Sequence, residues 1–254
     1  MLESYVREKL KKKDILLMTH IVLGYPSFEE SFRVVEAMVE AGVDMMELQI
    51  PFSEPMADGP VIVKTNQTAL ERGSTVAKCF DAAREIASRF PIPFLFMSYY
   101  NILFKYGTGR FATDMARAGL RGAIIPDVPP EEGDEYLQAM DDNGLSPIFI
   151  YAPTTTDQRM QHLARYTRGF VYCVARRGVT GEKTEFSRDL DSYLSRCRRA
   201  TDLPLAVGFG VKDKGDVDFL KGKADIAVIG TQTIRIIDAH GVDAAGEFIR
   251  GIVA

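Results

Sequence analysis

The chain has 254 residues, 46% of them hydrophobic and 26% charged, which is the composition of an ordinary globular protein. Its net charge of −4, from 31 basic and 35 acidic residues, gives no support to nucleic-acid binding. No apolar stretch is long enough to cross a membrane, and the charged residues within the first ten positions exclude the apolar core of a signal peptide.

The first predicted element is an amphipathic helix at residues 2–10. Its apolar residues Leu2, Val6 and Leu10 recur at helical spacing, with charged residues between them. We expect this helix to cover the N-terminal end of the fold, and a helix that binds another protein is the alternative. The basic run at residues 11–13 is expected to be a solvated helix end.

Short β-rich runs alternate with longer amphipathic segments through the rest of the chain. We predict strands at eight such runs: residues 15–23, 44–50, 93–98, 122–126, 147–151, 169–174, 203–207 and 226–229. Helical periodicity predicts helices between them: residues 28–41, 76–89, 130–143, 157–166 and 189–201.

This alternation predicts an α/β fold. Apolar strands that are each followed by a helix require a parallel sheet covered on its outer face. Eight such units closing on themselves form a (β/α)8 TIM barrel, and a doubly wound open sheet is the alternative. No linker or composition break divides residues 1–254, so we expect a single domain with an extra N-terminal helix.

Cysteine and histidine usage points to a reducing compartment and away from a metal site. The three cysteines are odd in number and lack C-x-x-C spacing, which favours free thiols and a cytoplasmic location. The three histidines are scattered along the chain, so we expect no metal ion.

Two carboxylates near the second predicted strand are the leading catalytic candidates. Glu47 lies in an apolar run, where an unpaired carboxylate would cost several kcal/mol and serves no packing purpose. Asp58 follows on a segment stiffened by three prolines, which make a helix or central strand unfavourable before it. A stiff loop can therefore hold Asp58 over the end of the strand that carries Glu47.

Other polar residues also fall at or just after the carboxyl ends of predicted strands, where barrel enzymes place their chemistry. These candidates are Tyr99, Tyr100 and Asn101, Asp127, residues 154–156, Tyr172, and residues 176–181. Each has a structural alternative. Asp127 can hold a turn between prolines, Asn101 can cap a helix, and Tyr99 and Tyr100 can pack with exposed hydroxyls.

Glycines after the last two strands predict a phosphate site. Gly208 and Gly210 follow the seventh strand, and Gly230 with Thr231 follows the eighth and opens a helix. In barrels these loops bind phosphate through backbone N–H groups and the positive end of a helix dipole. Tight turns are the alternative explanation. Gly178 and Gly181 bracket a loop suited to closing over the same ligand.

The motifs together resemble the tryptophan synthase α subunit family along nearly the whole chain. The main signature is the segment 51–60, Pro-Phe-Ser-Glu-Pro-Met-Ala-Asp-Gly-Pro, with Glu47 just before it. The further matches are residues 24–27, 99–101, 126–129, 152–155, 177–181 and 207–210.

This resemblance implies a carbon–carbon lyase that cleaves indole-3-glycerol phosphate to indole and glyceraldehyde 3-phosphate without a cofactor. It implies that Glu47 protonates the indole ring carbon, that Asp58 accepts a hydrogen bond from the ring N–H, and that Tyr172 positions Glu47 or the substrate. The further implied substrate residues are Tyr99, Asp127, Arg176, Thr180 and Phe209. The implied phosphate residues are Gly181, Gly210, Gly230 and Thr231.

The resemblance also implies a partner, the pyridoxal-phosphate-dependent β subunit, in an αββα heterotetramer that passes indole internally. Two other functions remain open: a free-standing lyase that releases indole, and a catalytically inactive barrel that binds a sugar phosphate and regulates another protein. Intact Glu47 and Asp58 argue against the inactive barrel.

Five positions depart from the family pattern, and none removes a proton-transfer group; one of them, Thr231, replaces a frequent serine and keeps the hydroxyl. Glu54 replaces an aspartate, Met56 a leucine, and Gln49 a glycine. Glu54 lies in the loop expected to communicate with the partner. His20 stands where an aromatic residue usually lines the indole pocket, and a core histidine with satisfied hydrogen bonds is its structural alternative.

Overall fold

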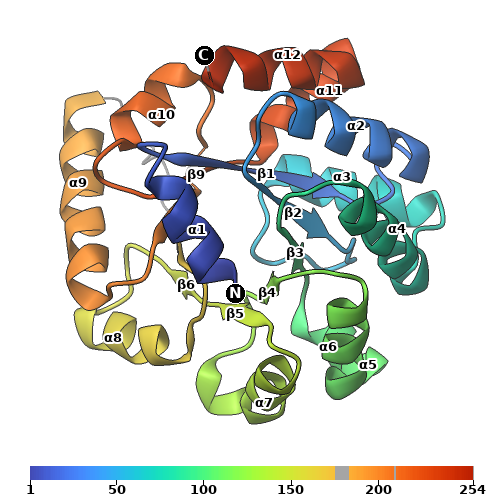
Figure 1. The fold of residues 1–254 in the computed structure, drawn as a ribbon, viewed down its shortest axis with the longest axis horizontal. Helices are drawn as coiled ribbons and strands as arrows, with labels where there is room; N and C mark the ends of the chain where they lie inside the picture. Colours follow the sequence, from blue (N-terminus) through green and yellow to red (C-terminus); the bar gives the residue numbers. More distant parts are fainter. Residues whose placement is uncertain (175–182, 209, 254) are drawn as a thin grey trace.

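Parallel strands occupy the centre of the molecule. The computed structural model describes residues 1–174, 183–208 and 210–253 (Figure 1). Within those residues one sheet contains nine strands: β1 Leu16–Val22, β2 Met45–Gln49, β3 Phe94–Met97, β4 Gly122–Ile124, β5 Ser146–Ile148, β6 Ile150–Tyr151, β7 Val171–Val174, β8 Leu205–Gly208 and β9 Ile226–Ile229. Each pair of neighbouring strands in the sheet is parallel.

The sheet closes because its first and last strands are halves of one predicted strand. The order is β5-β4-β3-β2-β1-β9-β8-β7-β6, and only Phe149 separates β5 from β6. All eight predicted strands are therefore confirmed, the fifth as this split pair. A closed ring of parallel strands with helical crossovers is the (β/α)8 barrel, and the open-sheet alternative is wrong.

Helices surround the outer face of the ring (Figure 1). They are α2 Phe28–Glu40, α3 Pro60–Glu71, α4 Val76–Arg89, α5 Tyr100–Tyr106, α6 Thr108–Arg117, α7 Asp134–Asp142, α8 Asp157–Tyr166, α9 Lys183–Ala200, α10 Lys214–Leu220, α11 Thr231–His240 and α12 Val242–Val253, with a short 3-10 turn, η1, at Pro130–Glu132. The predicted helices at 76–89 and 157–166 match α4 and α8. The prediction at 130–143 is split by Gly133, and α9 begins earlier than predicted.

Side-chain caps fix where three of these helices begin. Ser27, Thr75 and Thr156 each accept a hydrogen bond from the backbone N–H three residues on, at the starts of α2, α4 and α8. Each cap satisfies one of the N–H groups that the first helical turn leaves unpaired. Thr156, a polar candidate in the sequence, therefore has a structural role.

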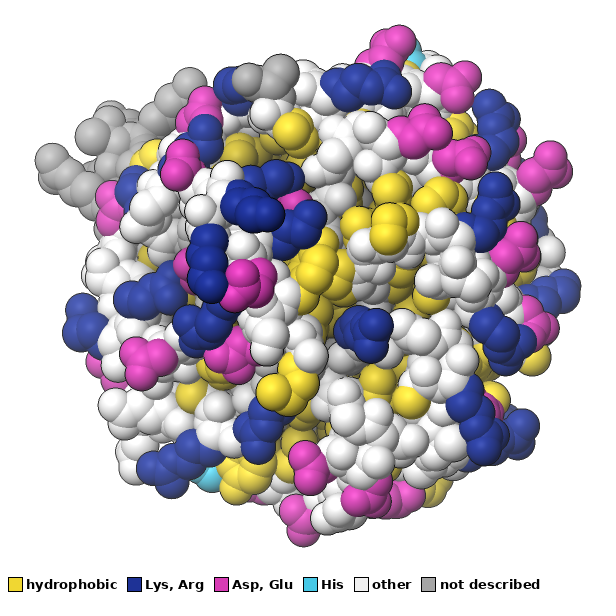
Figure 2. Space-filling model, in the orientation of Figure 1, with side chains coloured by type: hydrophobic (Ala, Val, Ile, Leu, Met, Phe, Trp, Pro, Cys, Tyr) yellow, Lys and Arg dark blue, Asp and Glu magenta, His cyan; other side chains and the backbone are white. Residues whose placement is uncertain are grey.

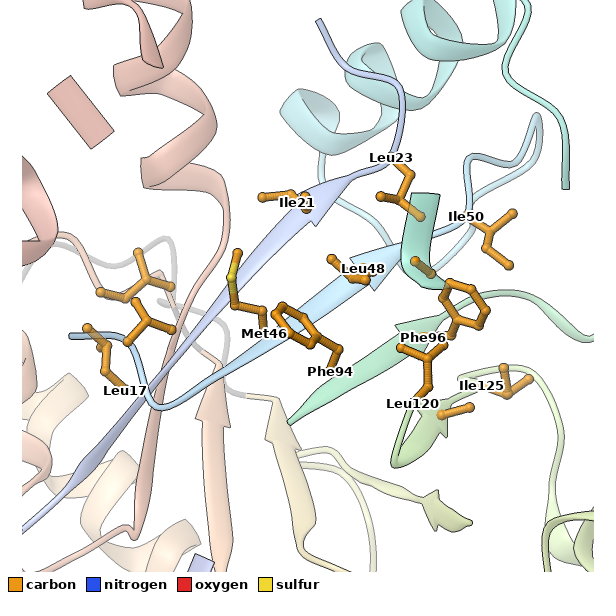
Figure 3. Packing of buried hydrophobic residues seen from close by; sticks show 14 of the residues in the cluster. Leu17, Ile21, Leu23, Met46, Leu48, Ile50, Phe94, Phe96, Leu120 and Ile125 are labelled. Atoms are coloured by element: carbon orange, nitrogen blue, oxygen red, sulfur yellow. The ribbon is translucent and has the colours of Figure 1, made fainter. Parts of the chain in front are cut away.

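The strands alternate between two apolar layers, and this alternation sets which residues can reach the barrel interior. Outward-facing side chains pack against the helices in the cluster that Figure 3 shows, including Leu17, Ile21, Met46, Leu48, Phe94 and Phe96. A second cluster fills the interior, including Leu16, Met18, Met45, Leu95, Met97 and Ile124. Since Met46 and Leu48 point outward, Glu47 between them points inward.

The N-terminal helix α1, Leu2–Leu10, covers the end of the barrel from which the strands start. Leu2 and Val6 are buried in the interior cluster with Leu16 and Phe170. The contact is close, because a Cβ added to Gly169 would lie 2.8 Å from Leu2 Cδ2. The predicted role of this helix is thus confirmed, and α1 crosses the ring of strands in Figure 1.

Val6→Ala is expected to destabilise the fold by about 2 kcal/mol, because it removes buried methyl groups at about 0.8 kcal/mol each and leaves a cavity. Val6 is fully buried. Urea unfolding monitored by circular dichroism measures the loss. Ser4→Ala, at an exposed position of the same helix, should change stability by less than about 0.5 kcal/mol. Equal losses in both variants would show that α1 does not close the barrel.

Charged side chains of both signs are interspersed on the face shown in Figure 2. Lys11 and Lys12 follow α1 as exposed residues, and Lys13 pairs with Asp44 at 2.7 Å. In the described part of the chain, no helix combines the length and apolarity needed to cross a membrane.

Candidate active site

Glu47 and His20 form a buried pair inside the barrel. The two residues are direct register partners on β2 and β1, and only 2% and 4% of their surfaces are exposed. His20 Nδ1 lies 2.8 Å from Glu47 Oε2. The carboxylate that looked anomalous on an apolar strand therefore has a polar partner. His20 is no isolated core residue, because it also lines the cavity described below.

Asp58 is held by two side chains, one at the end of β2 and one just after β3. Its Oδ2 accepts a hydrogen bond of 2.7 Å from Gln49 Nε2 and one of 3.0 Å from the Tyr99 hydroxyl. That hydroxyl in turn accepts from the backbone N–H of Ala57 at 3.1 Å, and the Tyr99 ring stacks on Phe52. The predicted stiff loop runs from β2 to Pro60 without helix, and these contacts fix Asp58 over the strand ends.

Burial and hydrogen bonding have opposite effects on the pKa of Asp58. Burial raises the pKa of this carboxyl group above its usual value. Hydrogen bonds from Gln49 and Tyr99 and the charge of His20 favour the ionised form and lower the pKa, but burial is the larger effect. Burial, together with the negative charge of Asp58, also raises the pKa of Tyr99, so its hydroxyl remains a donor at neutral pH.

Tyr172 lies across the cavity on β7. Burial, and then the charges of Glu47 and Asp58, raise its pKa well above the ordinary value, so the phenol keeps its proton. A side chain at Gly208 on the next strand would collide with it, because a Cβ there would lie 2.5 Å from the Tyr172 hydroxyl. Gly208 therefore leaves the space that the phenol occupies.

One cavity at the carboxyl ends of the strands brings most of these groups together. It is lined by side chains and backbone that include His20, Glu47, Asp58, Tyr172, Gly208, Gly210, Gly230 and Thr231. Gly230 is the residue before α11, whose first turn has no side-chain cap. The first N–H groups of a helix and its dipole favour an anion. The predicted phosphate loop after the eighth strand thus opens into the same cavity as both carboxylates.

The structure does not bring every predicted residue to this cavity. Asp127 accepts a hydrogen bond of 2.8 Å from the backbone N–H of Tyr100 at the start of α5, and it is not among the residues that line the cavity. Tyr99 lies behind Asp58. Arg176, Thr180, Gly181 and Phe209 fall outside the described residues.

Sequence reasoning missed the role of Gln49. It was noted only as a departure from the family pattern, yet its side chain is fully buried and holds Asp58. One signal could have found it: Gln49 is two residues after Glu47, so both face the barrel interior.

A closed barrel with two carboxyl groups and a helix N-terminus at the carboxyl end of its strands defines the class, a TIM-barrel enzyme. The model of the family described as "Tryptophan synthase alpha chain" matches residues 6–250. The chain belongs to this family, which makes it a lyase.

Known proteins match this chain over nearly its full length. The tryptophan synthase alpha chain of Syntrophotalea carbinolica is 63% identical over 99% of this chain and 100% of its own length. That of Desulforapulum autotrophicum is 62% identical with the same coverage. A crystal structure of tryptophan synthase from M. tuberculosis superimposes with a TM-score of 0.91 at 27% identity, covering 100% of this chain and 98% of that one.

Proposed function

We propose that this chain cleaves indole-3-glycerol phosphate to indole and glyceraldehyde 3-phosphate by a retro-aldol reaction. The observation that carries the proposal is a single cavity that contains Glu47, Asp58 and the N-terminus of α11. The reaction needs no cofactor.

Glu47 is the proposed general acid and base. The ring carbon that bears the side chain must be protonated before the carbon–carbon bond can break. Oε1 of Glu47 is buried without a hydrogen-bond partner among the described residues, while Oε2 is held by His20. Oε1 is thus the atom available to the substrate, first to give a proton to the ring and then to take one from the side-chain hydroxyl.

Asp58 and Tyr172 complete the proposed catalytic group. Protonation of the ring carbon places positive charge on the ring nitrogen, and an ionised Asp58 stabilises it by accepting the N–H hydrogen bond. Because Gln49 and Tyr99 both bond to Oδ2, Oδ1 of Asp58 is the oxygen left for the substrate. Tyr172 limits the position of the substrate from the opposite wall.

The proposed phosphate site consists of Gly210, Gly230 and Thr231, which line the cavity, together with Gly181. Gly210 has φ of +74°, a backbone conformation that glycine adopts without strain and that lets the loop approach a ligand closely. Arg176, Thr180, Phe209, Tyr99 and Asp127 stay predicted substrate residues.

We also propose that the partner is a pyridoxal-phosphate-dependent β subunit in an αββα heterotetramer. Two large apolar side chains support a docking face: Met56 is 81% exposed and Phe104 is 71% exposed. Both follow neighbouring strands β2 and β3, on the side of the barrel where the cavity opens. Exposed apolar residues near an active site are typical of a protein interface.

A cytoplasmic location and a single domain are further parts of this proposal. The free cysteines Cys79, Cys173 and Cys197 are all buried, as suits a reducing compartment. One core cluster includes residues from Leu17 to Ile252, which supports one folding unit.

Indole release from purified protein and indole-3-glycerol phosphate tests the proposal, measured with and without a β subunit. We expect slow release by the chain alone and a large increase when the β subunit is added. Fast release that ignores the β subunit would identify a free-standing lyase. If the chain bound indole-3-glycerol phosphate but released no indole with or without the β subunit, the proposed activity would be refuted. The inactive regulatory barrel would then be the function that agrees with the data.

A further inference from the structure

His20 holds one oxygen of Glu47 and leaves the other free. The two side chains meet at 2.8 Å between Nδ1 and Oε2, with both residues nearly inaccessible to solvent. Their backbones are direct register partners on adjacent parallel strands, so the contact is set by the sheet itself. A buried carboxylate that is bonded on one oxygen has its orientation fixed.

Backbone geometry favours this arrangement. On the other side of β1, His20 packs against Gly230: a Cβ added to Gly230 would lie 3.4 Å from His20 Cβ, an ordinary van der Waals distance. The imidazole has room toward Glu47 and the cavity.

We propose that His20 is a positioning residue for Glu47, which orients Oε1 toward the substrate and keeps one dissociable proton within the His20–Glu47 pair. This inference rests on the proposed function, because it assigns Glu47 the proton transfer.

The catalytic cycle returns to the His20–Glu47 pair the proton that it takes from it. The pair begins with one dissociable proton, shared between the imidazole and the carboxylate. Carried on Oε1 of Glu47, the proton passes to the indole ring carbon, which leaves a neutral imidazole whose Nδ1–H donates to Oε2 of the carboxylate. When the carbon–carbon bond breaks, its electrons restore the ring double bond, the hydroxyl O–H electrons form the aldehyde carbonyl, and the hydroxyl proton returns to the pair.

Charged and polar groups around His20 favour its protonated form. Burial alone lowers the pKa of His20, but the hydrogen bond and charge of Glu47, the charge of Asp58 and the side chain of Gln49 together raise it above the ordinary value. Tyr172 faces the same cavity from β7 and is neutral. A histidine with a raised pKa is protonated below that pKa and loses its proton as the pH rises through it. Activity should therefore fall on the alkaline side at that pH.

Two replacements separate positioning from proton retention. His20→Phe removes both, and we expect kcat to fall by about 10-fold or more, with the alkaline limb that belongs to the His20 imidazole lost from the pH profile of kcat/KM. In the His20→Asn variant, the asparagine side chain places an amide nitrogen near the position of Nδ1. This amide can donate the hydrogen bond to Glu47, but it is not a titratable group. The variant should restore most of kcat without restoring the alkaline limb.

Thr19→Val is the matched control, since Thr19 is buried on the same strand and points outward. Its pH profile should equal that of the wild type. A wild-type kcat and alkaline limb in His20→Phe would overturn the inference.

A second measurement does not depend on activity. NMR titration of the His20 imidazole should give a lower pKa in Glu47→Gln than in the wild type, and an unchanged value would also overturn the inference. If the wild type releases no indole, the proposed function fails, while this titration still decides whether the pair holds the proton.

Discussion

Glu47→Gln is expected to lower kcat for indole release by roughly 10²- to 10⁴-fold, the usual contribution of a general acid–base group. The glutamine keeps the shape of the side chain and can still accept the hydrogen bond from His20 Nδ1, but it has no proton to donate to the ring carbon. Substrate binding, measured as the rise in Tm with indole-3-glycerol phosphate, should stay close to that of the wild type.

Asp44→Asn is the matched control for this prediction. Asp44 is the residue just before β2, and only 3% of its surface is exposed. Its carboxylate accepts a hydrogen bond from the backbone N–H of Leu17 and pairs with Lys13. Its replacement should lower the free energy of unfolding and leave kcat unchanged, the reverse of Glu47→Gln. If Glu47→Gln kept the wild-type kcat, the assignment of the acid would be wrong.

The barrel could be predicted from the sequence because its signal is repeated along the chain. Each apolar run followed by an amphipathic segment indicates the same unit, so an error in one unit does not change the fold. The boundaries were less certain where one residue interrupts an element. Phe149 divides a predicted strand and Gly133 divides a predicted helix, and neither residue breaks the periodicity of its segment.

The two candidate carboxylates could also be predicted, because a charged residue on an apolar strand and a second one on a proline-rich loop are local signals. Their partners could not. His20 is 27 positions from Glu47, and Tyr99 is 41 from Asp58. Only the register between β1 and β2, and the packing of the loop on Phe52, bring these pairs together.

Gln49 is the clearest example of a site residue whose contact could not be predicted from the sequence. Compared with the family pattern it was a departure with no assigned role, since a pattern compares positions and does not measure contacts. The structure shows that its amide lies within hydrogen-bond distance of Asp58. A polar residue two positions from a catalytic candidate on a strand shares its face, so this period-two relation is a usable signal.

Asp58→Asn is expected to lower kcat by about 10²- to 10³-fold, the usual effect of removing one electrostatic contact to the transition state. Asparagine has no charge to stabilise the positive ring nitrogen. The pH profile of kcat/KM provides the more specific result. Because burial raises the pKa of Asp58, the acid limb of the wild type should lie above the ordinary aspartate value, with activity lost as the pH falls through that pKa. In Asp58→Asn this limb should disappear.

Tyr99→Phe shows whether the acid limb belongs to Asp58. The variant keeps the ring that stacks on Phe52 and the charge at position 58, but it removes one of the two hydrogen bonds to Oδ2. That bond lowers the pKa of Asp58, so its loss should raise this pKa and move the acid limb to higher pH, with kcat at its optimum falling far less than in Asp58→Asn. An acid limb that stays in place in both variants would mean that another group titrates there, and that Asp58 acts through position and not through charge.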